Sequence, residues 1–115
     1  MKDFIHQNKV YYSPVEFAMA HIGGVWKIPI IVSLRTSGLR YGELKDRIAH
    51  ISDKMLITQL RELEEKGMVS RTIYREKPPR VDYQLSEKGI QALPVIDLLA
   101  SYGQVLMQTA DIKYK

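Results

Sequence analysis

Apolar and polar residues follow one another along the chain in the pattern of a helical protein with one pair of short strands. Ser13-Pro14-Val15-Glu16 is typical of a helix start, with a hydroxyl N-cap, a proline in the first turn and a carboxylate that can reach back. We expect this first helix to end near His21, because Gly23-Gly24 follows. A second helix, apolar on nearly every side, is predicted from Trp26 to about Ser37 and should lie in the middle of the core.

A helix-turn-helix is predicted over about residues 40–67. Apolar residues at i, i+3 and i+7, counted from Tyr41, form the stripe of a two-turn helix. After a short joint, Ser52 can cap a fourth helix that runs to Lys66 and is ended by Gly67. Two helices with so short a joint are typical of this motif.

The last third of the chain predicts a wing and a long helix. Two β-rich segments, Val69–Arg75 and Arg80–Leu85, flank a proline-containing tip and predict a two-stranded hairpin, the wing, over about residues 68–85. A last helix, capped by Ser86, is predicted over about residues 86–109. It has more apolar residues than one core-facing stripe requires, so we expect a second buried face and hence a partner subunit.

The fourth predicted helix has two different sides on a helical wheel. Basic, hydroxyl and apolar side chains on its outer side suit the phosphates, base edges and thymine methyl groups of a major groove. Its acidic residues leave an ordinary solvated face open as the alternative. Gln59 lies toward the core edge and is expected to have a structural role. The predicted core face is Met55, Leu56, Leu60 and Leu63, and the predicted DNA-binding residues are Ser52, Lys54, Ile57, Thr58 and Arg61.

Positive charge is concentrated in the wing. The chain carries a net charge of +4 with a pI of about 9.3, and residues 68–80 hold four Lys or Arg residues against one Glu. A basic hairpin beside a recognition helix can reach the DNA backbone or the minor groove. A solvated hairpin is the alternative interpretation. The predicted wing contacts are Arg71, Arg75, Lys77 and Arg80.

Length and composition narrow the classes of function. At 115 residues, with 45% hydrophobic and 26% charged residues, the chain suits one globular domain over residues 1–115. It has no cysteine, its three histidines are scattered, and no glycine-rich phosphate-binding motif is present. We therefore expect no enzymatic activity, no catalytic residues, no cofactor and no metal site. The sequence shows neither a secretory signal nor a long uninterrupted apolar stretch, so we expect a cytoplasmic protein without a membrane partner.

Several motifs stand in order over about residues 11–103. Among them are Ser13-Pro14-Val15-Glu16-Phe17 and Leu39-Arg40-Tyr41-Gly42-Glu43-Leu44, and the most telling are the turn Gly23-Gly24-Val25-Trp26-Lys27 and the wing Pro78-Pro79-Arg80-Val81. As a set, these motifs resemble the HxlR-type winged helix-turn-helix transcriptional regulators. The resemblance implies a mainly α fold with a small β-hairpin (α+β), in a dimeric bacterial or archaeal DNA-binding regulator whose first and last helices form the dimer interface.

Some residues depart from the family pattern. Ser13 stands where many members have the cysteine used for sensing oxidants and aldehydes, so that mode of sensing does not carry over. Ile57 and Thr58 stand where Thr and Gln are usual, so an operator sequence does not carry over from the family. Arg75 and Lys77 replace a proline and an apolar residue, so this wing should bind phosphate more strongly than most.

Two functions from different classes follow from these observations. The first is a homodimeric transcription factor that binds a palindromic operator in double-stranded DNA, with a possible small-molecule effector bound where the helix of Trp26 meets the last helix. The alternative is a winged-helix interaction module whose basic wing contacts protein or RNA. A steep salt dependence and a large preference for one palindrome would favour the first function.

Overall fold

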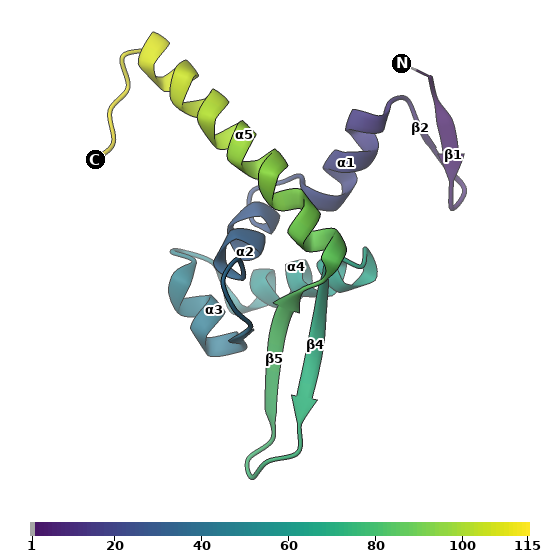
Figure 1. Cartoon of the computed structure of the whole chain (residues 1–115), viewed down its shortest axis with the longest axis vertical. Coiled ribbons are helices and arrows are strands. Elements are labelled where there is room, and N and C mark those ends of the chain that lie inside the picture. Colours follow the sequence, from purple (N-terminus) through teal and green to yellow (C-terminus); the bar gives the residue numbers. More distant parts are fainter. Residues whose placement is uncertain (1) are drawn as a thin grey trace.

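The computed structural model describes residues 2–115, and this part of the chain forms five helices and two small antiparallel sheets. Figure 1 shows how they are arranged. This is a winged helix-turn-helix fold, as predicted. In chain order the elements are β1 (Phe4–His6), β2 (Lys9–Tyr11), α1 (Pro14–Ile22), α2 (Lys27–Ser33), β3 (Leu39–Arg40), α3 (Tyr41–Arg47), α4 (Asp53–Glu65), β4 (Val69–Tyr74), β5 (Arg80–Leu85) and α5 (Glu87–Thr109).

Three helices begin at the serines that the sequence indicates. The Oγ atoms of Ser13, Ser52 and Ser86 each accept a hydrogen bond from the backbone N–H three residues later, at 3.1, 3.0 and 3.1 Å. Each bond satisfies an amide that would otherwise have no partner in the first turn, worth about 1 kcal/mol. Gly67 ends α4 with φ +75°, a left-handed conformation that only glycine adopts without strain. These helix boundaries are therefore set by local chemistry.

The second helix is shorter than predicted. It ends at Ser33 rather than near Ser37, and Leu34 has already left helical geometry at φ −92° and ψ 8°. The reason is the strand that follows: Leu39 is 4% exposed and pairs with β5, so the chain must turn early to reach the sheet. The central position of the helix is confirmed, because Ile30 is fully buried.

The core lies where α2, α3, α4 and the first half of α5 meet. Ile31, Leu44, Leu56 and Leu63 are completely buried there. Met55, predicted to belong to this core, is 36% exposed. It lies at the margin of the apolar face of α4, and its sulfur accepts a hydrogen bond from the Gln59 amide at 3.4 Å instead.

The wing belongs to a sheet of three strands, where the sequence predicted two. The order is β3-β5-β4, and the short β3 pairs Leu39 with Tyr83 and Arg40 with Asp82. The hairpin itself has the predicted limits to within one residue, with Tyr74 facing Arg80 at its far end. The added strand joins the helix-turn-helix to the base of the wing.

A second hairpin, β1-β2, precedes α1 and was not predicted. Its turn residues Gln7 and Asn8 both have positive φ, 48° and 64°, as two-residue hairpin turns of this twist require. On one side, Phe4 and Tyr11 pack against Phe17 of α1, with ring centroids 5.3 and 4.9 Å from that ring. The hairpin is thus attached to the molecule through aromatic contacts with α1.

The molecule is extended for its length. Its radius of gyration is 16.2 Å, against about 13 Å for a compact domain of this size. In Figure 1 the wing projects from one end, and the second half of α5 and the β1-β2 hairpin project from the other. Two different surfaces therefore extend away from the core in opposite directions.

Candidate nucleic-acid interface

The outer face of α4 is free of packing contacts with the core. Lys54, Thr58 and Arg61, spaced i, i+4 and i+7, are all exposed, and Ile57 beside them is 47% exposed. Behind them the leucines of the same helix are buried, so the predicted division of α4 into two sides is present. A helix with one side anchored and the other side basic and exposed has the form needed to enter a major groove.

The hydroxyl groups on α4 are already engaged with its backbone. Thr58 Oγ1 donates to the carbonyl of Lys54 at 2.8 Å, and Ser52 Oγ accepts from the Met55 N–H as the N-cap. A hydroxyl has one proton and two lone pairs, so Thr58 keeps acceptor capacity on its outer side. It is therefore suited to receive a hydrogen bond from a base amino group.

A cluster of polar side chains connects α3 to the first turn of α4. The hydroxyl of Tyr41 donates to Asp53 Oδ1 at 2.6 Å, and Lys45 Nζ lies 3.2 Å from the same oxygen. The hydrogen bond to Asp53, followed by desolvation, raises the pKa of Tyr41 to about 12. The pKa of Asp53 is lowered, first by the bond from Tyr41 and then by Lys45. This cluster links the two helices of the helix-turn-helix through side-chain contacts.

Two of the four predicted wing cations are occupied by contacts within the protein. Arg71 Nε lies 3.0 Å from Glu64 Oε2 and so ties β4 to α4. The guanidinium of Arg80 stacks over the ring of Tyr74, 4.0 Å from its centroid, and Nη1 lies 3.4 Å from a Glu76 oxygen. These two arginines shape the wing, and a phosphate would have to compete for them.

The other two wing cations, Arg75 and Lys77, lie at the exposed tip of the hairpin. Neither forms an ion pair within the part of the chain that the structure describes. Ile73, 65% exposed, and Pro79 lie beside them along one shallow hollow. The tip thus presents two free positive charges next to apolar surface.

A groove of about 270 Å³ joins the wing to α4. The Arg71–Glu64 ion pair lies in this groove, so the base of the wing is linked directly to the helix. The outer side of α4 and the base of the wing therefore meet in one groove. The groove is lined by Ile57, Leu60, Arg61, Glu64, Arg71 and Tyr83.

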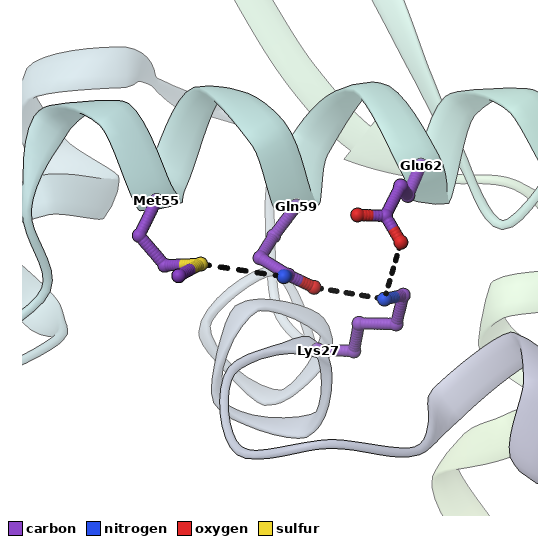
Figure 2. Close-up of polar contacts among 4 residues, drawn as sticks. All are labelled: Lys27, Met55, Gln59 and Glu62. Carbon is purple, nitrogen blue, oxygen red and sulfur yellow. Dashed lines mark hydrogen bonds and ion pairs between the residues drawn. The ribbon is translucent and has the colours of Figure 1, made fainter.

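Two cations that the sequence did not single out lie close to this surface. Arg40 is exposed on β3, beside the wing strand β5, where the pattern of a buried Leu39 followed by a basic residue could have indicated it. Lys27 is only 8% exposed, and its ammonium donates to Gln59 Oε1 at 2.8 Å and to Glu62 Oε1 at 3.1 Å (Figure 2). Gln59 thus has the structural role expected of it.

An apolar cavity of about 260 Å³ lies between α1 and the first half of α5. The sequence placed a possible effector pocket between the helix of Trp26 and α5, whereas this cavity is lined by α1, α5 and Met68 and is open to solvent. Its polar rim consists of His21, Lys88 and Gln91. Within residues 2–115, no group of three or more His, Asp or Glu side chains could hold a metal ion.

Comparisons with known proteins agree with this geometry. The family model described as HxlR-like helix-turn-helix matches residues 21–111. An uncharacterized HTH-type transcriptional regulator of Methanothermobacter thermautotrophicus is 42% identical over 95 residues, which are 83% of this chain and 72% of that protein.

Solved structures of transcriptional regulators also match this chain. The uncharacterized HTH-type transcriptional regulator YtcD of Bacillus subtilis has a solved structure that matches with a TM-score of 0.79 at 40% identity, over 84% of this chain and 98% of that chain. The redox regulator HypR in its reduced form matches with a TM-score of 0.80 at 34% identity, over 86% and 98% of the two chains.

Proposed function

Because this chain belongs to the HxlR-like helix-turn-helix family and is a DNA-binding transcriptional regulator, we propose that it acts as a homodimer on a palindromic operator. In each protomer α4 enters the major groove and the wing follows the backbone or the minor groove. The observation that carries this proposal is the groove that joins the exposed basic side of α4 to the base of the wing, with two free cations at the tip of the same hairpin.

We assign different tasks to the residues of α4. Arg61 can form two hydrogen bonds with guanine O6 and N7, and Lys54 can reach guanine or a phosphate. Since the Thr58 proton is held by the Lys54 carbonyl, Thr58 accepts a hydrogen bond from adenine N6 or cytosine N4. Ile57 packs on a thymine methyl group. Ser52, as the N-cap, holds the first turn close to a phosphate.

The wing supplies binding affinity that depends little on the DNA sequence. Arg75 and Lys77 bind phosphates, because their charges are free and a backbone contact carries no base information. Arg71 and Arg80 hold the wing in shape and add to the positive field. Arg40, beside the wing strand, is a further candidate for a phosphate contact.

The second half of α5 supports the homodimer. Val95, Leu98, Tyr102 and Val105 follow one another at intervals of three and four residues and are 48, 73, 61 and 55% exposed. This spacing is that of a helix seam that packs against another helix. The protomer itself covers only the first half of α5, so a second copy of the chain is the natural cover for the remainder.

Exposed apolar residues also lie on α1 and the N-terminal hairpin. Val15 and Met19 of α1 are 56 and 46% exposed, and the cross-strand pair Ile5 and Val10 of the hairpin is 73 and 40% exposed. A hairpin of three-residue strands is barely stable alone, and its outer side would be covered by the partner. We therefore include α1 and β1-β2 in the dimer interface.

By length and composition α5 could also cross a membrane. Ala92, Leu93 and Ile96 of this helix belong to the domain core, however, and its cap, Ser86, follows directly on the wing strand β5. A helix built into the winged domain in this way fits a subunit interface better than a lipid environment. We propose a cytoplasmic location on the same grounds, since the relatives are transcriptional regulators.

Control by a small molecule, if present, is non-covalent. HypR is named a redox regulator, but this chain has no cysteine that could carry thiol chemistry. The cavity between α1 and α5 is mostly apolar with Lys88 and His21 at its rim, which suits a small apolar molecule with one negative group. A ligand there would act between the dimer helix and the start of the wing.

Selection of bound sequences from random duplex DNA tests the proposal. We expect one palindrome whose half-sites lie about 34–36 Å apart, or a multiple of that distance. Affinity for it should exceed affinity for random duplex by about 10³-fold or more and fall steeply with salt. If the selection enriches no palindrome, or if all duplexes bind with equal affinity, the proposed sequence-specific binding is wrong.

A further inference from the structure

Lys27 is the one buried charged residue among the residues that the structure describes. It is the first residue of α2, and its side chain is 10% exposed. The ammonium reaches the inner side of α4, where it binds Gln59 Oε1 at 2.8 Å and Glu62 Oε1 at 3.1 Å. Figure 2 shows Lys27 extending from α2 toward both side chains.

The partners of Lys27 form a row along α4. The Gln59 amide nitrogen also donates to the sulfur of Met55 at 3.4 Å, so positions 55, 59 and 62 are linked along two turns (Figure 2). The proposed DNA-contacting residues occupy positions 54, 58 and 61 of the same helix. Each of the linked positions is one residue further on, which places the row about 100° around the helix from the DNA face.

The other end of α2 is joined to α5. Arg35, two residues beyond α2, forms two hydrogen bonds with Asp97 of α5, at 2.6 and 3.3 Å. The start of α2 is therefore joined to α4 through Lys27, and its end is joined to α5 through Arg35. A single short helix connects the proposed recognition helix to the proposed dimer helix.

We propose that Lys27 is a positioning residue for DNA reading, which fixes the rotation of α4 about its own axis and so sets which bases are preferred. The inference rests on the proposed role of α4 and assigns Lys27 no contact with DNA. Through Lys27 at its start and Arg35 beyond its end, α2 connects α4 to the proposed dimer helix. A change at the dimer interface could therefore alter sequence preference.

The geometry makes small rotations costly for base contacts. Side chains of an α-helix end about 5–6 Å from its axis, so a rotation of about 20° moves their tips by about 2 Å. Hydrogen bonds to base edges tolerate only about half an ångström of variation in length. Phosphate contacts through flexible lysines and arginines adapt to such a shift far better. Loss of the Lys27 contacts should therefore reduce selectivity more than general affinity.

The test compares Lys27→Met, Lys27→Arg and Lys113→Met with the unaltered chain. Methionine keeps the length of the apolar stem, and the carboxylate left without its partner, Glu62, is 44% exposed and can be solvated by water. Lys113, exposed near the C-terminus, is the matched control for loss of one positive charge. For each variant the dissociation constant is measured for the palindrome found by selection and for a random duplex of the same length.

We expect Lys27→Met to lower the ratio of specific to random affinity about tenfold, the effect of losing one good base contact, with random affinity changed less than about twofold. Lys27→Arg should restore part of the ratio, and Lys113→Met should leave it unchanged. Equal losses on both duplexes, or an unchanged ratio, would overturn the positioning role.

A second set of variants covers the case in which Lys27→Met folds poorly. Glu62→Gln removes the charge of the partner at a side chain that is 44% exposed, and it should lower the ratio in the same direction. Adding it to Lys27→Met should cause little further loss, because both act on one contact. Arg61→Ala separates the two proposals. If Arg61→Ala lowers the ratio while Lys27→Met and Glu62→Gln do not, α4 reads DNA without needing the contacts of Lys27. If none of the three does, α4 is not the reading helix.

Discussion

Replacing Leu98 with alanine should dissociate the proposed dimer. Leu98 is 73% exposed in the protomer and lies in the middle of the seam on α5. Full burial of a leucine side chain contributes about 1.5–3 kcal/mol, so the exposed part contributes about 1–2 kcal/mol when a partner covers it. Because a two-fold interface contains the residue twice, the change weakens dimerisation by about 2–4 kcal/mol.

At tenfold in Kd for each 1.4 kcal/mol, the dimer dissociation constant should rise roughly 30- to 700-fold. Sedimentation equilibrium from nanomolar to micromolar protein measures this directly, and circular dichroism checks that helix content is kept. Ile73→Ala is the matched control, because Ile73 is 65% exposed but lies on the wing. Its dimer constant should not change.

The reasoning fails if Leu98→Ala and Ile73→Ala dimerise equally well. It also fails if the unaltered chain is a monomer at micromolar concentration. In the first case the dimer would use another surface. In the second case each protomer would read a half-site alone, and the expected palindrome would lose its physical basis.

Four further outcomes can be measured on the same protein. Arg61→Ala should cost about 1–3 kcal/mol at the selected site and relax preference at one base pair; an equal loss on every duplex would make it a phosphate contact. Lys77→Ala should weaken all duplexes alike and lower the slope of log affinity against log salt by about one, and a changed base preference would contradict this. The pKa of Tyr41 is raised to about 12 by its hydrogen bond to Asp53, so this bond stabilises the fold fully below about pH 10 and is lost as pH rises toward 12. Tyr41→Phe should abolish this alkaline loss of unfolding free energy in denaturation curves. The same alkaline loss in Tyr41→Phe would rule out the contribution of the bond. The pKa of Asp53 is lowered, so its contribution is present above the ordinary Asp pKa and is lost as pH falls through the lowered value; Asp53→Asn should flatten that acid limb.

The features that could be predicted from sequence are those with a local cause. The caps at Ser13, Ser52 and Ser86 depend on residues within one turn, and all three are present. The exposed side of α4 follows from helical periodicity, and the exposed positions agree with it. The wing limits follow from a β-rich run interrupted by two prolines.

The features that sequence did not reveal depend on distant residues or weak local patterns. The β1-β2 turn uses Gln7 and Asn8, neither of them the glycine that marks such turns most clearly. The two-residue strand β3 is defined only by its pairing with β5, more than forty residues later in the chain. The burial of Lys27 depends on acceptors 32 and 35 residues away. Arg71 likewise looked free in sequence, although Glu64 neutralises it in the fold.

Neighbouring residues of α4 have different roles, and the position at which the helix begins determines which residues face outward. Positions 54, 58 and 61 face outward, whereas the next residues, 55, 59 and 62, form the row held by Lys27. A shift of one residue would rotate the helix by about 100° and could bring positions 55, 59 and 62 to the outer side in place of 54, 58 and 61. The Ser52 cap and the left-handed Gly67 fix both ends of the helix and so prevent that shift. In the proposed complex, the local chemistry at these two ends therefore determines which side chains would face DNA, and the distant contact with Lys27 would determine how firmly they are held there.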